Sequence, residues 1–199
     1  MTPVLRPLAA ALAASLVVVG ALAGEHSPDQ RSNAEMAGLT ICLVDADVAV
    51  ATLAQMASGR PREEVERAVE QTLSDPAYRE YVKRTVSAIY SVRPRDERTW
   101  LSQRLRACAG GASAKARVAM ADSCYRLTRY AKDIYAQRDA KLPLDDALLA
   151  LDRVSGSDGL SLTSAESLKR MARTIYGSGT GVTQFRTGLF VSCVLPKSQ

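Results

Sequence analysis

The sequence predicts an all-α protein: two tandem disulfide-closed four-helix units that follow a cleaved signal peptide. Three observations predict it. The first residues have the pattern of an export signal, four cysteines bound two segments of similar length, and one motif occurs twice. That motif is Lys-Arg, four residues, then Ile-Tyr, first from Lys83 to Tyr90 and again from Lys169 to Tyr176. Apolar residues recur at helical spacing in both copies, so the motif indicates the buried face of a helix.

Residues 1–23 are predicted to be a signal peptide. Leu8 to Val19 is unbroken apolar or small, and Ala21-Leu22-Ala23 is a small-x-small cleavage site. An uncleaved anchor is the alternative, but Leu8 to Ala23 has only 16 residues, and a spanning helix needs about 20. We therefore expect cleavage, which leaves 176 of the 199 residues, and a periplasmic or secreted protein. We judge no later segment apolar enough to cross a bilayer, so we expect no transmembrane segment in the mature chain.

The composition favours a globular, helical protein. Apolar residues make up 47% of the chain, an ordinary fraction, whereas aromatic residues make up only 5%. Much of the core must therefore come from alanine and leucine, which favour helices. The formal net charge is +5, and it falls to +4 when Arg6 leaves with the signal peptide. Because acids are interspersed among the basic residues, this charge favours solubility, and we expect no nucleic-acid partner.

The first unit is predicted to span residues 33–108. A flexible leader at residues 24–32 precedes it and holds the only histidine, His26. The first helix should begin near Ser32 or Asn33, and since it is apolar on nearly all sides it should be central. The expected helices are Ser32 or Asn33 to Ala57, Pro61 to Leu73, Pro76 to Tyr90 with Asp75 as its cap, and Arg95 to Cys108.

A second unit with the same order is predicted for residues 113–193. The distance from the first cysteine of each unit to the next proline is the same, because Pro143 lies 19 residues after Cys124 and Pro61 lies 19 residues after Cys42. The other expected features are a linker at Ala109 to Ala112, a first helix from Ser113 to Arg138, loops at Ser155 to Gly159 and Gly177 to Gly181, a capping box of Thr163 with Glu166, and a last helix that ends at Cys193.

The four cysteines are expected to form disulfides, because an exported chain enters an oxidising compartment. Three pairings are possible. The repeat favours Cys42 with Cys108 and Cys124 with Cys193, separated by 66 and 69 positions, since Cys108 with Cys124 would make the two units unequal. Each bond should stabilise the protein by about 4 kcal/mol. Free thiols or metal ligands are the rival interpretation, but the sequence has no Cys-x-x-Cys or Cys/His cluster, so no metal site is expected.

Two acid pairs are the only candidates for acid–base chemistry. Glu63 and Glu64 follow the proline of the first unit, and Asp145 and Asp146 follow that of the second. Paired carboxylates can act as general acid and base. Acids in the first turn of a helix also complement its dipole, and adjacent helical side chains point about 100° apart, so they do not converge. With the one histidine in the leader, we expect no catalytic residue and no cofactor.

Several basic and aromatic side chains are candidates for binding. Lys83, Arg84, Lys169 and Arg170 could form an interaction patch, or they could be the solvated face opposite the apolar stripe. Tyr90 and Tyr176 should pack at helix ends with each hydroxyl on a backbone group or water. The densest basic run, which could meet acidic lipid or polysaccharide, comprises Arg93, Arg95, Arg98, Arg104 and Arg106.

The cysteine-bounded unit, with its proline-bearing turn and late Ile-Tyr, resembles small exported bacterial proteins built from Cys-bounded helical repeats, a group of uncharacterised function. The resemblance covers nearly all of Cys42 to Cys193, and it implies a fold but no active site. The second unit departs from the pattern, because Ala140-Lys141 replaces Ser58-Gly59 and leaves that turn geometry open. At the level of fold the chain is also similar to periplasmic immunity proteins and acid-stress chaperones of the periplasm.

We therefore expect an exported, non-enzymatic helical interaction module that binds a protein partner in the cell envelope, with an inhibitor or immunity role as one version. A stapled scaffold without a catalytic set favours it. The alternative is an envelope enzyme that acts on cell-wall polymer through Asp and Glu residues.

Overall fold

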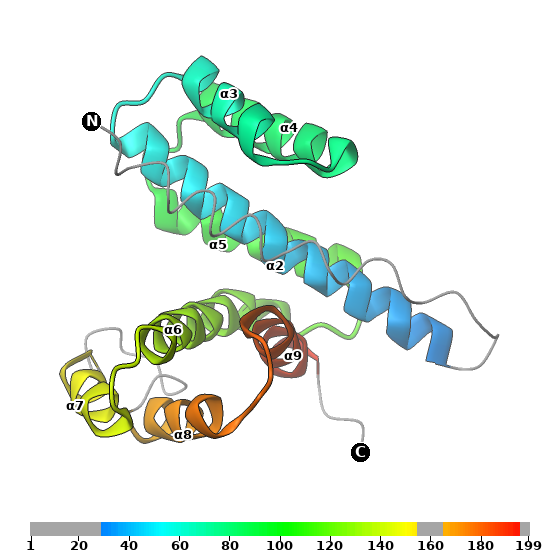
Figure 1. Ribbon diagram of the computed structural model, residues 1–199. Coiled ribbons are helices and arrows are strands. Elements are labelled where there is room, and N and C mark those ends of the chain that lie inside the picture. Colours follow the sequence, from blue (N-terminus) through cyan, green and yellow to red (C-terminus); the bar gives the residue numbers. More distant parts are fainter. Residues whose placement is uncertain (1–28, 155–164, 196–199) are drawn as a thin grey trace. The chain divides into compact units, whose positions relative to one another are not determined.

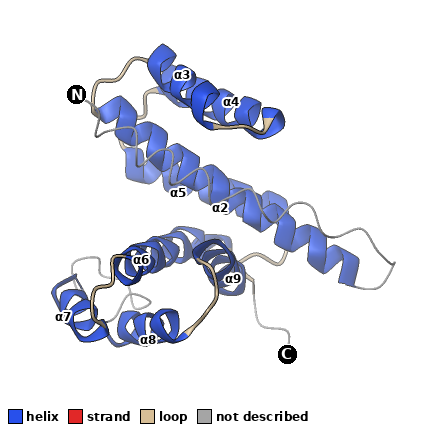
Figure 2. Ribbon diagram, in the orientation of Figure 1, coloured by secondary structure: helices blue, strands red, loops and turns tan. Residues whose placement is uncertain are grey.

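A computed structural model describes residues 29–154 and 165–195 of the chain. Within these residues the protein is helical and has no strand, so the predicted all-α class is confirmed (Figure 2). The predicted signal peptide, the predicted loop from Ser155 to Gly159, and Thr163 of the predicted capping box lie outside the described residues. The elements are α2 (Asp29–Ala57), α3 (Arg62–Thr72), α4 (Pro76–Val92), α5 (Glu97–Ala112), η1 (Val118–Met120), α6 (Ala121–Asp139), α7 (Leu144–Val154), α8 (Ala165–Gly177) and α9 (Val182–Val194).

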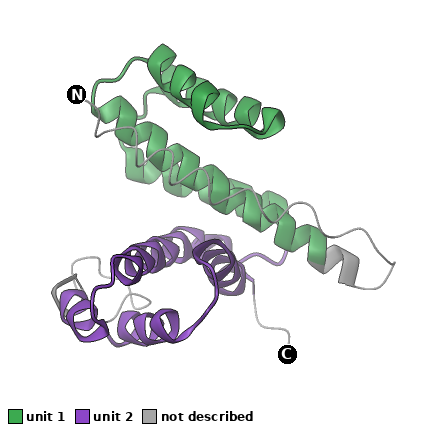
Figure 3. Ribbon diagram, viewed as in Figure 1, with its two compact units in different colours: residues 1–113 green, residues 114–199 purple. Residues whose placement is uncertain are grey.

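The chain divides into two compact units, residues 1–113 and 114–199 (Figure 3). In the first unit α2 packs against α5 and α4, and α3 packs against α4 (Figure 1). In the second unit α6 packs against α9 and α8, and α7 packs against α8. Each unit therefore pairs its first helix with its fourth and third, and its second helix with its third.

Each core is built from the apolar stripes of these helices. Branched aliphatic side chains dominate the first core, whereas the second adds aromatic and sulfur-containing side chains. Burial of such side chains is the main stabilising term for helices that would be marginal alone. The buried clusters comprise Val48, Val65, Val69, Leu73, Val82 and Val86 in the first unit, and Ala131, Ile134, Tyr135, Leu151, Leu168, Met171, Ala172 and Ile175 in the second.

The α2 helix is central to the first unit, as its apolar sequence predicts, since it contacts α3, α4 and α5. The judgement that no segment after residues 1–23 is apolar enough to cross a bilayer is wrong. Asn33–Ala57 has 25 residues and is long and apolar enough to do so by length and composition, with half of its most apolar stretch buried in the unit. A core helix passes the same test, because a helix that is buried on several sides has few polar positions.

The predicted linker at Ala109 to Ala112 is wrong, because these residues are the last turn of α5. Small side chains there allow α2 and α5 to approach closely. A Cβ placed on Gly38 of α2 would lie 3.0 Å from the Cβ of Ala112, and Ala109 is fully buried. The glycine and alanine run therefore permits close helix packing instead of a flexible connection.

Other boundaries shift by a few residues. The α2 helix begins at Asp29, inside the segment assigned to the leader, as acidic residues also favour a first helical turn. Asp75 caps α4 as predicted, because its carboxylate accepts a hydrogen bond from the Tyr78 backbone N–H at 2.6 Å. The second unit's first helix does not begin at Ser113; a 3₁₀ turn at Val118–Met120 precedes α6.

Both disulfides form as the repeat predicts. Cys42 is bonded to Cys108, and Cys124 is bonded to Cys193, with Cα atoms 5.7 Å apart in each case. Each bond joins the first helix of a unit to its fourth. Two such bonds indicate an oxidising, extracytoplasmic compartment.

Candidate functional site

The turn between the first and second helix has the same geometry in both units. We call two residues corresponding when they occupy the same position in the two units. The offset between them is 82 positions in the first two helices, set by the shared prolines, 86 in the third helix, set by the repeated motif, and 85 in the fourth helix, set by the last cysteines. Gly59 has φ +76° and the corresponding Lys141 has φ +61°. The N–H of Gly59 bonds to Met56 O at 3.0 Å, and that of Lys141 to Arg138 O at 2.9 Å. The left-handed turn is therefore kept without glycine.

Two tyrosines fasten this turn to the third helix of each unit. The Tyr90 hydroxyl donates to the Arg60 carbonyl at 2.7 Å, and the Tyr176 hydroxyl donates to the Leu142 carbonyl at 3.0 Å. The acceptors are corresponding residues, so the predicted backbone partners are confirmed. Burial raises the pKa of both hydroxyls above the ordinary tyrosine value, which keeps them protonated as donors.

An open hollow of about 630 Å³ lies beside this turn in the first unit. The end of α2, the start of α3 and the end of α4 form its wall. Arginine is the most frequent lining residue, and one acid, Glu63, accompanies the three arginines. The lining residues are Met56, Gly59, Arg60, Pro61, Arg62, Glu63, Tyr90, Ser91 and Arg93. We name this concavity the arginine hollow.

The three arginines of the hollow differ in their partners. Arg60 donates from Nη1 to the Gln55 side chain at 3.0 Å. Arg62 lies with its Nε 3.2 Å from a Glu66 oxygen. Arg93 is exposed and stands at φ +44°; its backbone N–H donates to the Ile89 carbonyl at 2.9 Å, but its side chain makes no hydrogen bond or ion pair with any described residue.

The corresponding positions of the second unit have a different chemistry. Leu142 and Leu144 stand where the first unit has Arg60 and Arg62. Arg138 replaces a methionine, stacks 4.5 Å from the Tyr135 ring and donates to the carbonyl of Ile175 at 3.2 Å. The turn thus forms with arginines at these two positions or with half-buried leucines, of which Leu144 packs against the second core.

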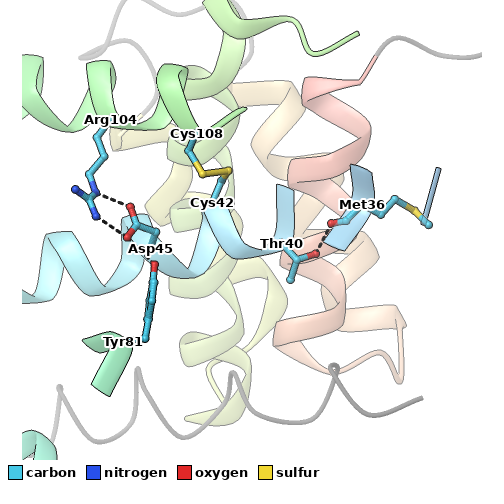
Figure 4. The surroundings of a disulfide bond; sticks show 7 residues. All are labelled: Met36, Thr40, Cys42, Asp45, Tyr81, Arg104 and Cys108. Atoms are coloured by element: carbon cyan, nitrogen blue, oxygen red, sulfur yellow. Dashed lines mark hydrogen bonds and ion pairs between the residues drawn. A yellow bond between two sulfur atoms is a disulfide. The ribbon is translucent and has the colours of Figure 1, made fainter. Parts of the chain in front are cut away.

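A polar cluster beside the first disulfide was not foreseen from the sequence. Asp45, one helical turn after Cys42, is 7% exposed and binds the Arg104 guanidinium through both carboxylate oxygens, at 2.5 and 2.7 Å (Figure 4). The Tyr81 hydroxyl donates to the same carboxylate at 2.6 Å. Burial and this hydrogen bond raise the pKa of Tyr81, and the bond to Asp45 raises the pKa of Arg104. The carboxylate is fully engaged by its neighbours.

The second unit replaces this cluster with apolar packing. Leu127 corresponds to Asp45 and Leu189 to Arg104, and both leucines pack against the second core. A different arginine, Arg186, lies buried there and donates to the Thr128 carbonyl at 3.1 Å. The fold therefore does not require the Asp45–Arg104 pair.

The predicted interaction residues lie on the third helix of each unit. Lys83 lies 2.6 Å from Glu70 and 3.8 Å from Glu80, and Lys169 lies 3.7 Å from Glu166. The hydrogen bond between Lys83 and Glu70 lowers the pKa of the carboxyl and raises that of the ammonium. Arg84 and Arg170 are exposed, and their side chains make no hydrogen bond or ion pair with the described residues. The lysines therefore belong to surface ion pairs.

The acid pairs lie in the first turns of α3 and α7 and are exposed. Glu64 is 3.8 Å from Arg60, so part of its charge is matched locally. Among the described residues, no group of three His, Cys, Asp or Glu side chains could hold a metal ion.

The arginines of the predicted basic run lie in different environments. Arg104 turns inward to Asp45 and Trp100, whereas Arg95, Arg98 and Arg106 are exposed.

Comparisons with protein-family models, with curated proteins and with solved structures found no match to this chain.

Proposed function

We propose that this chain is an exported, non-enzymatic helical module that binds a protein partner in the cell envelope, with an inhibitor or immunity role as one form. The observation that carries the proposal is the contrast between a repeated scaffold and a changed surface. The same turn and tyrosine bond occur in both units, yet Arg60 and Arg62 line it in one and Leu142 and Leu144 in the other. Changing the surface of a fixed scaffold is how binding modules acquire partners.

In this proposal the two units are copies of one four-helix plan, each closed by its own disulfide, and residues 1–23 are removed on export. The periplasm or the exterior is then the place of action, consistent with two disulfides. Disulfides that join the first helix to the fourth keep the surface ordered before binding, which reduces the entropy lost when a partner binds.

The interior polar groups also favour binding over catalysis. Asp45 is held by two arginine N–H groups and a tyrosine hydroxyl and is only 7% exposed, so its carboxylate is used to hold the helices together and is poorly placed to reach a substrate. The exposed acids Glu63 and Glu64 are adjacent on α3, so helix geometry separates their directions by about 100°. The alternative, an enzyme that acts on cell-wall polymer through Asp or Glu, finds support in no described group of converging carboxylates.

The proposal is tested by capture with the oxidised protein. A chain of residues 24–199 carrying a photo-crosslinker should capture one envelope protein in a fixed ratio, and reduced, alkylated protein should lose it. The matched control, Asp145→Asn with Asp146→Asn, lies in the second unit and should capture the partner equally well. A second variant adds Glu63→Gln and Glu64→Gln, and it tests for the enzyme. Hydrolysis of cell-wall polymer by the wild type, abolished in this variant, would refute the proposal in favour of the enzyme.

A further inference from the structure

The arginine hollow is a feature of the first unit that its fold does not explain. The second unit builds the same left-handed turn, with the same backbone bonds and tyrosine anchor, around Leu142 and Leu144. The arginines at 60 and 62 are therefore not needed to form the turn. A basic lining that the scaffold does not require is evidence for a role in binding.

Arg93 strengthens this evidence. It ends α4 in the left-handed region, at φ +44° and ψ +66°, where glycine is the favoured residue. A cation at a helix C-terminus complements the dipole, which is one use for this side chain. That use needs no left-handed backbone and no place in the lining of a hollow. Strain at a residue whose charge has no partner among the described residues is typical of a functional position.

The charges of the lining select among anions. Three arginines and one acid, Glu63, line the hollow; Arg60 and Arg62 are also paired with Glu64 and Glu66 outside the lining, and each guanidinium carries five N–H donors. Arg60 and Arg62 use only some of these donors within the chain. A planar carboxylate fits the remaining pairs of donors, whereas the nearby Glu63 would repel a doubly charged phosphate more strongly than a singly charged group.

We propose that the arginine hollow binds a carboxylate of the polypeptide partner, either an acidic side chain or a free C-terminus, with Arg93 as the main contact and Arg60 and Arg62 as its supports. This inference rests on the proposed function, which it makes more specific. The hollow's volume of about 630 Å³ is in the range of sites that enclose small groups. Met56, Pro61 and Tyr90 add apolar surface for the chain next to that carboxylate.

Fluorescence anisotropy with labelled peptides tests this inference on residues 24–199. The probes are an amidated hexaglutamate and a glycine-serine peptide with a free or an amidated C-terminus. Saturable binding of hexaglutamate indicates an acidic side chain, and binding of the free but not the amidated peptide indicates a C-terminus. Arg93→Gly should lower the affinity for the probe that binds about tenfold, which is the effect of losing one charge-assisted contact. Arg60→Leu with Arg62→Leu should weaken it further and still fold, as leucines do in the second unit.

Arg84→Ala is the matched control, because it removes one exposed positive charge from the same helix outside the hollow. It should change affinity less than about twofold. The inference is overturned if no probe binds, if Arg93→Gly binds as well as wild type, if Arg84→Ala weakens binding equally, or if inorganic phosphate displaces the peptide better than acetate. A captured envelope partner that binds Arg93→Gly normally would overturn this inference and leave the proposed function intact.

Discussion

Replacing both members of the Asp45–Arg104 pair with the leucines of the second unit should cost much less than the sum of the two single replacements. Asp45→Leu leaves the guanidinium unpaired, and since the Arg104 side chain is 31% exposed, water compensates in part, for a loss of about 2 kcal/mol. Arg104→Leu leaves a carboxylate whose side chain is only 10% exposed, for about 3 kcal/mol. The double variant should lose only about 2 kcal/mol, because just the Tyr81 bond and some packing remain uncompensated.

The sequence offers a direct probe for this experiment. The chain has one tryptophan, Trp100, and it lies in the first unit. Urea unfolding without reductant, followed by the fluorescence of Trp100, therefore reports on this unit. The variants are compared by their unfolding midpoints, because Arg104 lies 5.4 Å from the indole and its replacement changes the fluorescence of the folded state. Lys83→Leu, which breaks an exposed ion pair, should leave the midpoint nearly unchanged. If the double variant lost about 5 kcal/mol of stability, the sum of the two single losses, the proposed correspondence between the units would be refuted.

Three further predictions concern the shared scaffold. Lys141→Gly should raise the free energy of unfolding by about 0.5–1 kcal/mol, because glycine adopts a positive φ without strain. Gly59→Lys should lower the free energy of unfolding of the first unit for the same reason. If both substitutions changed stability in the same direction, the two turns would not share one geometry. Tyr90→Phe and Tyr176→Phe should each cost about 1 kcal/mol in chemical unfolding, and an unaffected stability would show that water replaces the hydroxyl contact. Changing both cysteines of the second disulfide to serine should cost about 4 kcal/mol and raise hydrogen exchange in residues 114–199 alone; a rise throughout residues 33–113 would contradict separate units.

Local signals predicted the elements of this fold well. Asp75 and Pro76 specify the start of α4, and spacing from the prolines indicated which cysteines would pair. The prediction of a linker from Ala109 to Ala112 was wrong, because small residues occur both in flexible linkers and where two helices pack closely. Only the position of Gly38 on the neighbouring helix decides between these roles. That information is tertiary and has no local signature.

The candidate site was largely beyond sequence reasoning. Asp45 and Arg104 lie 59 positions apart, and a single acid in an apolar helix gives no partner. One signal was present: Asp45 lies three residues after Cys42, and Arg104 four before Cys108. Helical spacing places each beside its cysteine, so the disulfide brings the two charges to the same side of the interface. The arginine hollow had no such signal, because three separate helix ends form it.

Each unit acts as an internal control for the other. Where the two agree, as in the turn, the tyrosine bond and the disulfide, the agreement identifies what this fold needs to form. Where they differ, the fold itself requires neither choice, because each arrangement is found in one of the two units. The Asp45–Arg104 pair and the arginine hollow both fall in the second class. The pair is largely internal and already neutralised, whereas the hollow is open and holds an arginine, Arg93, whose side chain has no partner among the described residues. A binding role is therefore better sought at the hollow than at the buried pair.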